Sequence, residues 1–176
     1  MTALPRIVRS RVPAEKWSID ARVGEPAVDV LGDARLDITA AHPATTGRLH
    51  TDRDRAHLLW RYGFEPLRYR ALTLDGDPAA GCVVFRLRRR GHATEAALCE
   101  VVVPGGDDQA RRSLESELVR RSGADYAIAL GSRYVTRSGY IRLPGQGPTL
   151  TWRALDETVA PPLRALDLTL GDVELF

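Results

Sequence analysis

The spacing of hydrophobic residues changes twice within the segment 96–130, AALCEVVVPGGDDQARRSLESELVRRSGADYAIAL. The apolar run 96–103 is typical of a strand, and a Pro-Gly-Gly loop follows it. The next apolar residues recur at helical spacing: Ala110, Leu114, Leu118 and Val119. Gly123 ends this helix, and bulky and small residues then alternate in 126–130. The pattern predicts a right-handed crossover that pairs two strands in parallel.

Strand patterns also precede this segment. The stretch 68–74 alternates around strand-forming residues, and 81–89 is a second strand-like run. A turn at 75–78 separates them, and the basic stretch 88–92 is interpreted as an exposed hairpin loop before the strand at 96–103. These three strands predict an antiparallel meander.

The chain is less regular before this meander. Prolines interrupt short apolar pieces in residues 1–46, so we expect one edge strand, a short helix and much loop there. A helix is predicted from Thr51, as its N-cap, to Gly63, as its stop. We therefore divide the chain into a poorly defined N-terminal segment, 1–46, and a domain, 47–176.

Composition narrows the function classes. The chain has 176 residues and a formal net charge of +2, which gives no electrostatic reason to expect nucleic acid or a membrane surface as a partner. Lys16 is the only lysine, which fits either Arg-rich phosphate sites or the codon bias of a GC-rich genome. No apolar run is long enough for a signal peptide or a membrane span, so we expect a cytoplasmic protein.

The cysteines and histidines do not suggest a metal site. The two cysteines form no CxxC motif and no cluster with histidine. A hairpin that turns near Arg90 would place Cys82 and Cys99 opposite each other on neighbouring strands. In a reducing compartment we expect them to be small buried hydrophobic residues.

Several stretches resemble the GNAT superfamily of acyl-CoA N-acyltransferases. VVVPGGDDQARR, 101–112, resembles the strand and pyrophosphate loop that open the CoA site of that family, and SRYVTRSGY, 132–140, resembles the stretch before its penultimate strand. HLLWRYGFEPLRYRAL, 57–72, and LTLGDVELF, 168–176, resemble a bacterial subgroup. The resemblance covers roughly 50–176 and implies an α/β fold: a mixed, mostly antiparallel sheet flanked by helices, with a splayed parallel strand pair. The first strand and helices of the family are not evident in the N-terminal part.

The resemblance implies acetyl-CoA or another acyl-CoA as co-substrate, with its pantetheine arm between the splayed strands and its pyrophosphate at the start of the helix. The residues that would contact it lie on the strand, the loop and the first helical turn: Val101, Val102, Val103, Gly105, Gly106, Gln109, Ala110, Arg111 and Arg112. The usual loop pattern is Q/R-x-x-G-x-G/A, whereas this chain has Asp107, Ala110 and Arg112 at the defining positions. In the alternative interpretation, Gly105 and Gly106 form a turn and Asp107 caps a helix that binds no ligand.

Glu100 is the candidate general base. It alternates with Leu98 and Val102, so one strand face would present a carboxylate among apolar residues, where burial raises its pKa. The alternative is an ion pair with Arg86 or Arg88 on the preceding strand.

Three further residues are candidates by resemblance. Tyr134 falls near the tyrosine that often protonates the departing thiolate in the family, although a ring packed on the sheet explains it too. Arg61 and Tyr62 lie on the short helix that borders the acceptor groove, where they would bind substrate, or else serve as a structural Arg and a core Tyr.

The expected function is an N-acyltransferase that moves an acetyl or other acyl group from CoA to an amine of a small molecule or a protein. The alternative is a GNAT-like module that has lost catalysis and acts in binding or assembly. The apolar residues Leu175 and Phe176 are compatible with a monomer or a homodimer.

Overall fold

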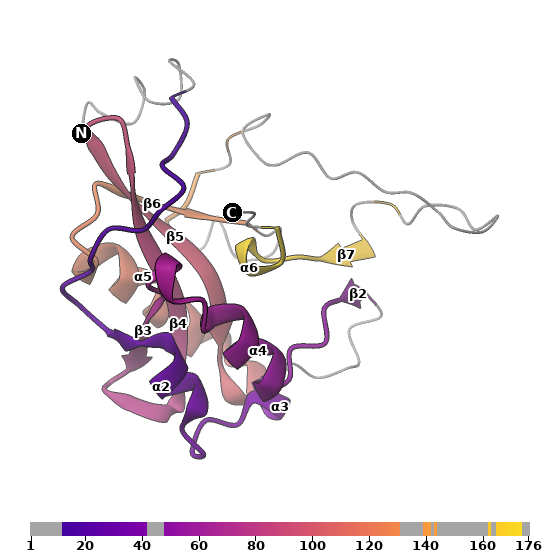
Figure 1. Cartoon of the computed structure of the whole chain (residues 1–176). Helices are drawn as coiled ribbons and strands as arrows, with labels where there is room; N and C mark the ends of the chain where they lie inside the picture. Colours follow the sequence, from indigo (N-terminus) through magenta and orange to yellow (C-terminus); the bar gives the residue numbers. More distant parts are fainter. Residues whose placement is uncertain are drawn as a thin grey trace.

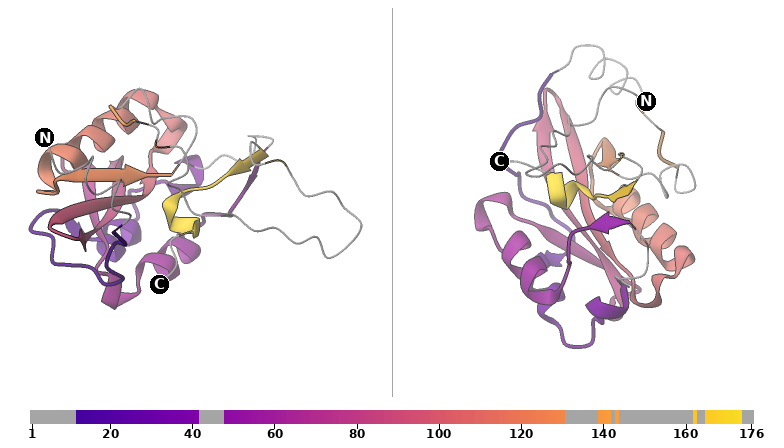
Figure 2. Two further views of the ribbon diagram at one scale, coloured as in Figure 1. Left: turned by 90° about the horizontal axis from the view of Figure 1, so that it is seen from above. Right: turned by 90° about the vertical axis from the view of Figure 1, so that its right-hand side faces the viewer.

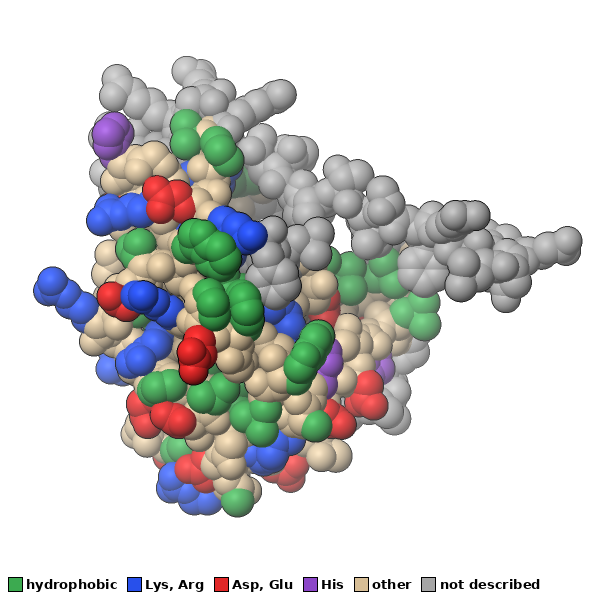
Figure 3. Space-filling view, in the orientation of Figure 1, with side chains coloured by type: hydrophobic (Ala, Val, Ile, Leu, Met, Phe, Trp, Pro, Cys, Tyr) green, Lys and Arg blue, Asp and Glu red, His purple; other side chains and the backbone are tan. Residues whose placement is uncertain are grey.

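The protein folds around one central sheet with helices on both faces (Figures 1 and 2). The computed structural model describes residues 12–41, 48–130, 139–141, 143, 162 and 165–173. The predicted α/β class, with a mixed and mostly antiparallel sheet that contains a parallel pair, is confirmed. On the face shown in Figure 3, acidic and basic side chains are interspersed, as the nearly balanced charge suggests.

The five strands of the sheet follow the order β1-β3-β4-β5-β6. Their bounds are β1 Glu25–Pro26, β3 Arg70–Leu74, β4 Asp77–Arg90, β5 Ala93–Val102 and β6 Tyr126–Ala129. Only β5 and β6 are parallel, and their pairing ends at Leu98 and Ala129. β5 itself continues to Val102. A second, two-stranded parallel sheet joins β2 Leu49–His50 to β7 Leu166–Asp167.

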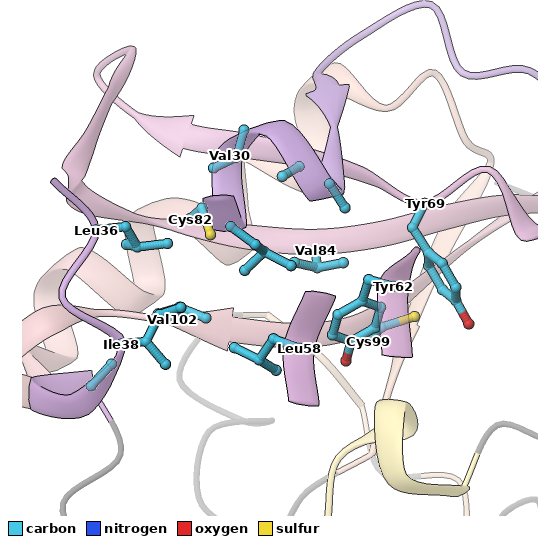
Figure 4. Packing of buried hydrophobic residues seen from close by; sticks show 14 of the residues in the cluster. Val30, Leu36, Ile38, Leu58, Tyr62, Tyr69, Cys82, Val84, Cys99 and Val102 are labelled. Carbon is cyan, nitrogen blue, oxygen red and sulfur yellow. The ribbon is translucent and has the colours of Figure 1, made fainter. Parts of the chain in front are cut away.

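Two layers of apolar residues cover the sheet. On one face, α2 (Ala27–Gly32), α3 (Ile38–Ala41) and α4 (Arg55–Tyr62) pack on β4 and β5 around residues such as Leu58 and Val84, as Figure 4 shows. On the other face, α5 (Asp108–Arg121) contributes Leu114 and Leu118 to a second core. Short 3-10 turns span Glu65–Leu67 (η1) and Pro104–Gly106 (η2), and α6 spans Leu170–Val173. Residues 27–41 thus share one core with the meander.

Helix α4 begins later than the sequence suggests. The carboxylate of Asp54, not the hydroxyl of Thr51, caps it by accepting a hydrogen bond from the backbone N–H of His57 at 2.7 Å. Thr51 instead donates its hydroxyl to Asp172 Oδ1 at 2.6 Å. The predicted N-cap was wrong because a tertiary partner takes the Thr51 hydroxyl, while Gly63 ends the helix as expected.

Only Gly91 and His92 of the basic stretch 88–92 form the hairpin turn, because β4 continues to Arg90. The reason is the fully buried Glu95 on β5. Arg88 Nε donates to Glu95 Oε1 at 2.6 Å, Arg90 Nη1 donates to Glu95 Oε2 at 3.2 Å, and the Tyr126 hydroxyl donates to Oε2 at 2.7 Å. Two arginines and one tyrosine therefore satisfy this carboxylate and extend the strands to the turn at Gly91.

A β-bulge changes the faces of β5. Val84 pairs with Glu100 but Phe85 pairs with Leu98, so β5 carries one extra residue, Cys99. Leu98 and Val101 consequently belong to the core under α5, whereas Cys99 and Val102 belong to the core under α4. The expected alternation of Leu98 with Glu100 on one face was therefore wrong. The bulge and the register also separate the cysteines: Cys82 pairs with Val102, and both cysteines are free and buried.

Arginine side chains donate hydrogen bonds to backbone carbonyls in segments that lie outside the helices and strands. Residues 15–19 run along the part of β4 that β3 leaves free, and Arg86 donates to the Lys16 carbonyl at 2.8 Å. Arg55 donates to the carbonyls of Leu31, Asp33 and Leu36, which tie the end of α2 to α4. A forked guanidinium suits such contacts because it points several N–H groups at different acceptors.

Candidate functional site

A buried group of charged side chains lies where β5 bulges. Arg53, just before α4, places Nε 2.9 Å from Glu100 Oε2 and also contacts Asp172 of α6. The side chains of Arg53, Glu100 and Asp172 are only 5%, 4% and 8% exposed. We call these three residues, with Thr51 and Thr169, the Arg53 cluster. Two carboxylates share one guanidinium in it.

Hydrogen bonds distinguish the two carboxylates. Asp172 accepts from the Thr51 hydroxyl at 2.6 Å and from the Thr169 backbone N–H at 2.7 Å. Glu100 accepts longer bonds, from the Val101 N–H to Oε1 and from the Thr169 hydroxyl to Oε2, both at 3.3 Å. Asp172 is therefore the better satisfied of the pair.

This arrangement gives Glu100 a proton affinity suited to chemistry at neutral pH. Burial raises the pKa of Glu100 to about 7, and the negative charge of Asp172 adds to that effect. The Arg53 guanidinium and the hydrogen bonds from Val101 and Thr169 lower the pKa, but burial dominates. A carboxyl with such a pKa can take up and release a proton near pH 7, as a general base or acid must.

The ion-pair alternative for Glu100 holds, but with a different arginine. Arg88 pairs with Glu95, and Arg86 reaches the Lys16 carbonyl. Arg53 pairs with Glu100 because α4 crosses the same face of the sheet to which the bulge turns this carboxylate. Sequence reasoning missed Arg53, Thr51, Thr169 and Asp172. One signal was available: Thr169 and Asp172 have the spacing of a helix capping box, and the Thr169 N–H to Asp172 bond is that contact.

Arg61 and Tyr62 lie next to the cluster. Arg61 donates Nε to the Gly171 carbonyl at 2.7 Å and Nη1 to the Tyr69 hydroxyl at 3.1 Å. Tyr62 is buried, packs edge-on against Tyr69, and has its pKa raised by burial and by the charge of Glu100. Both side chains join α4 to the C-terminal segment. Tyr134 lies outside the described residues.

The loop after β5 begins three residues beyond Glu100. Val101, Val102 and Val103 are buried, and Gly105 and Gly106 have φ values of 71° and 69°, which only glycine adopts readily. The remaining candidates lie in the first turns of α5: Gln109, Ala110, Arg111 and Arg112. Ala110 is buried, and Arg112 donates to Gln109 Oε1 at 3.0 Å.

Asp107 caps α5. Its carboxylate accepts a hydrogen bond from the Gln109 backbone N–H at 2.7 Å. It thereby uses one of the donors that a pyrophosphate would take at the start of a helix, and it adds a negative charge there. The cap predicted in the alternative interpretation is present.

No family model, curated protein or solved structure matches this chain. Within the residues that the structure describes, every helix is too short or too polar to cross a membrane. The same residues contain no group of three or more His, Cys, Asp or Glu side chains placed to hold a metal ion.

The cap can be tested by substitution. Asp107→Ala should lower the free energy of unfolding by about 1 kcal/mol, because the Gln109 N–H loses its acceptor. Asp107→Ser keeps an acceptor oxygen and should restore most of that loss. Equilibrium unfolding in denaturant measures both, and equal losses for Ala and Ser would show that the carboxylate does not cap α5.

The raised pKa of Glu100 predicts a pH dependence. Its folded pKa of about 7 exceeds the ordinary value of 4.5, so its contribution to stability is present below pH 4.5 and is lost as pH rises through 7. Glu100→Gln mimics the protonated carboxyl. The unfolding free energy of this variant relative to wild type should therefore rise between about pH 5 and pH 8. A difference independent of pH would mean that the pKa of Glu100 is not raised.

Proposed function

We propose that this chain is a GNAT-like N-acyltransferase that moves an acetyl or other acyl group from CoA to an amine, with Glu100 as the general base. The observation that carries the proposal is a buried carboxyl with a pKa raised to about 7 on β5, two residues beyond the Leu98–Ala129 pair that joins β5 to the parallel strand β6. The strand order of the five-stranded sheet and its parallel pair β5–β6 are compatible with that fold. The acceptor is a small-molecule amine or an amine of a protein.

The chemistry assigns one step to Glu100. An amine arrives as an ammonium ion, and the Glu100 carboxylate removes a proton from it. The amine nitrogen then attacks the thioester carbonyl carbon, the carbon–sulfur bond breaks, and the CoA thiolate leaves. A proton donor, a role we give to Tyr134, protonates the thiolate, and the second proton that the amine nitrogen loses as it becomes an amide restores this donor. A base with a pKa near 7 is partly ionised at neutral pH, so it can perform this step without a metal.

The residues after β5 would hold the co-substrate. Backbone groups of Val101–Val103 would face the pantetheine arm, and the amides of Gly105 and Gly106 would face the pyrophosphate. The 14-residue helix α5 directs its positive dipole end to the same place. Arg111 and Arg112, on its first turns, supply cations that partly offset Asp107 and Asp108.

Asp107 favours a second candidate. A helix start that already has its own carboxylate cap needs no bound anion, and a negative side chain repels pyrophosphate. In this case the chain is a GNAT-like module that has lost catalysis and serves in binding or assembly.

An acyl-transfer assay decides between the two candidates. Purified protein is mixed with acetyl-CoA and a broad panel of amines, and free thiol is measured. We expect thiol release that depends on an amine, and a loss of at least about 100-fold in Glu100→Gln, the lower range for a general base.

The matched control is Glu95→Gln, which removes another buried, arginine-paired carboxylate from the same strand. Glu95→Gln should lower stability but keep acyl transfer at temperatures where it is folded. Absence of transfer with every amine, together with no thermal shift on adding CoA, would exclude the acyltransferase and leave the second candidate. Equal activity in Glu100→Gln and wild type would exclude Glu100 as the base.

A further inference from the structure

The carboxyl of Glu100 is covered by a short piece of chain from far along the sequence. Residues Leu166–Val173 form β7 and α6, with β7 beside β2 and α6 against β5 (Figures 1 and 2). Thr169 and Asp172 of this piece are the side chains that close the Arg53 cluster over Glu100. We call Leu166–Val173 the cover.

Polar contacts hold the cover in place. Arg48 donates to the Leu166 carbonyl, Arg53 to the Asp167 carbonyl at 3.3 Å, and Arg61 to the Gly171 carbonyl at 2.7 Å. Among residues 166–173 Gly171 is buried and the Asp172 side chain is 8% exposed, while the other residues are partly exposed and Leu170 packs at the edge of the core. An element that is held by hydrogen bonds and ion pairs and buries little apolar surface has a lower free energy of local opening than a core strand.

Gly171 fits closely against the site. A Cβ at this position would collide with the Tyr62 hydroxyl and would lie 3.2 Å from the Cys99 carbonyl oxygen. The absence of a side chain therefore lets α6 approach both α4 and the bulge of β5. A closed cover depends on this contact as well as on Asp172.

The rest of the site keeps its charge balance when the cover opens. In the closed state Glu100 and Asp172 share Arg53, so two carboxylates face one guanidinium in a buried space. When the cover leaves, Asp172 gains water, and Arg53, just before α4, and Glu100 on β5 remain as a balanced pair. Opening thus relieves the repulsion between the carboxylates while it gives up the contacts of Asp172.

We propose that Leu166–Val173 is a detachable cover over Glu100, closed by Arg53 acting between Glu100 and Asp172, and that an amine reaches Glu100 only when the cover is open. The second half of this statement rests on the proposed acyl transfer. The opening itself does not, because it concerns contacts within this chain alone.

Amide hydrogen exchange, followed by mass spectrometry of peptides from the whole chain, tests the opening without CoA or amine. Amides of 166–173 in wild type should exchange faster than those of β4 and β5, because the cover opens locally. Asp172→Asn should speed exchange in the cover by about tenfold or more, the factor expected when contacts to a buried charge are lost. Gly171→Ala should also speed it, because a Cβ would collide with the Tyr62 hydroxyl. Exchange in β4 should stay unchanged.

The control is Asp75→Asn, which removes a carboxylate from the exposed turn between β3 and β4. It should leave exchange in the cover unchanged. The proposal would be overturned if the amides of the cover exchanged as slowly as those of β4 and β5. It would also be overturned if the amides of the cover exchanged at the same rate in wild type, Asp172→Asn and Gly171→Ala. Because thiol release is measured separately, loss of the acyltransferase proposal would leave the exchange result standing, and the reverse also holds.

Discussion

The buried guanidinium of Arg53 is the contact on which the candidate site depends. A charge without water needs partners, and Arg53 finds them in Glu100 and Asp172, which lie on the central sheet and near the far end of the chain. The cluster therefore joins the start of α4, the bulge of β5 and α6 into one unit. Burial raises the pKa of Glu100 to about 7, although the charge of Arg53 opposes that shift.

Buried polar groups also have arginine partners elsewhere in the fold. Glu95 is fully buried and is satisfied by Arg88, Arg90 and Tyr126 at the other end of β5. Arg55 satisfies three carbonyls between α2 and α4. This chain has a single lysine, and its arginines pair with buried carboxylates and donate hydrogen bonds to backbone carbonyls outside helices and strands. A lysine ammonium group suits these contacts less well than a planar guanidinium does.

Periodicity alone was enough to predict the meander, the crossover and the parallel pair, because the strand and helix patterns there differ clearly. It could not predict the face of Glu100: nearly all of β5 is buried on both sides, so its residues show no polar–apolar alternation, and the extra residue Cys99 reverses the faces. Spacing also favoured Arg86 and Arg88 as partners. Arg53 lies 47 positions from Glu100, and only the packing of α4 on the sheet brings the two together.

The buried carboxyl of Glu100, the loop and helix start beyond it, and residues 166–173 over it meet around one shared guanidinium. We infer that Arg53 couples Glu100 to Asp172. A double-mutant cycle of Glu100→Gln and Asp172→Asn, measured as free energies of unfolding at neutral pH, tests this directly. We expect an interaction energy of about 1 kcal/mol or more, because the carboxylates share Arg53. A double variant whose change equals the sum of the two single changes would contradict it.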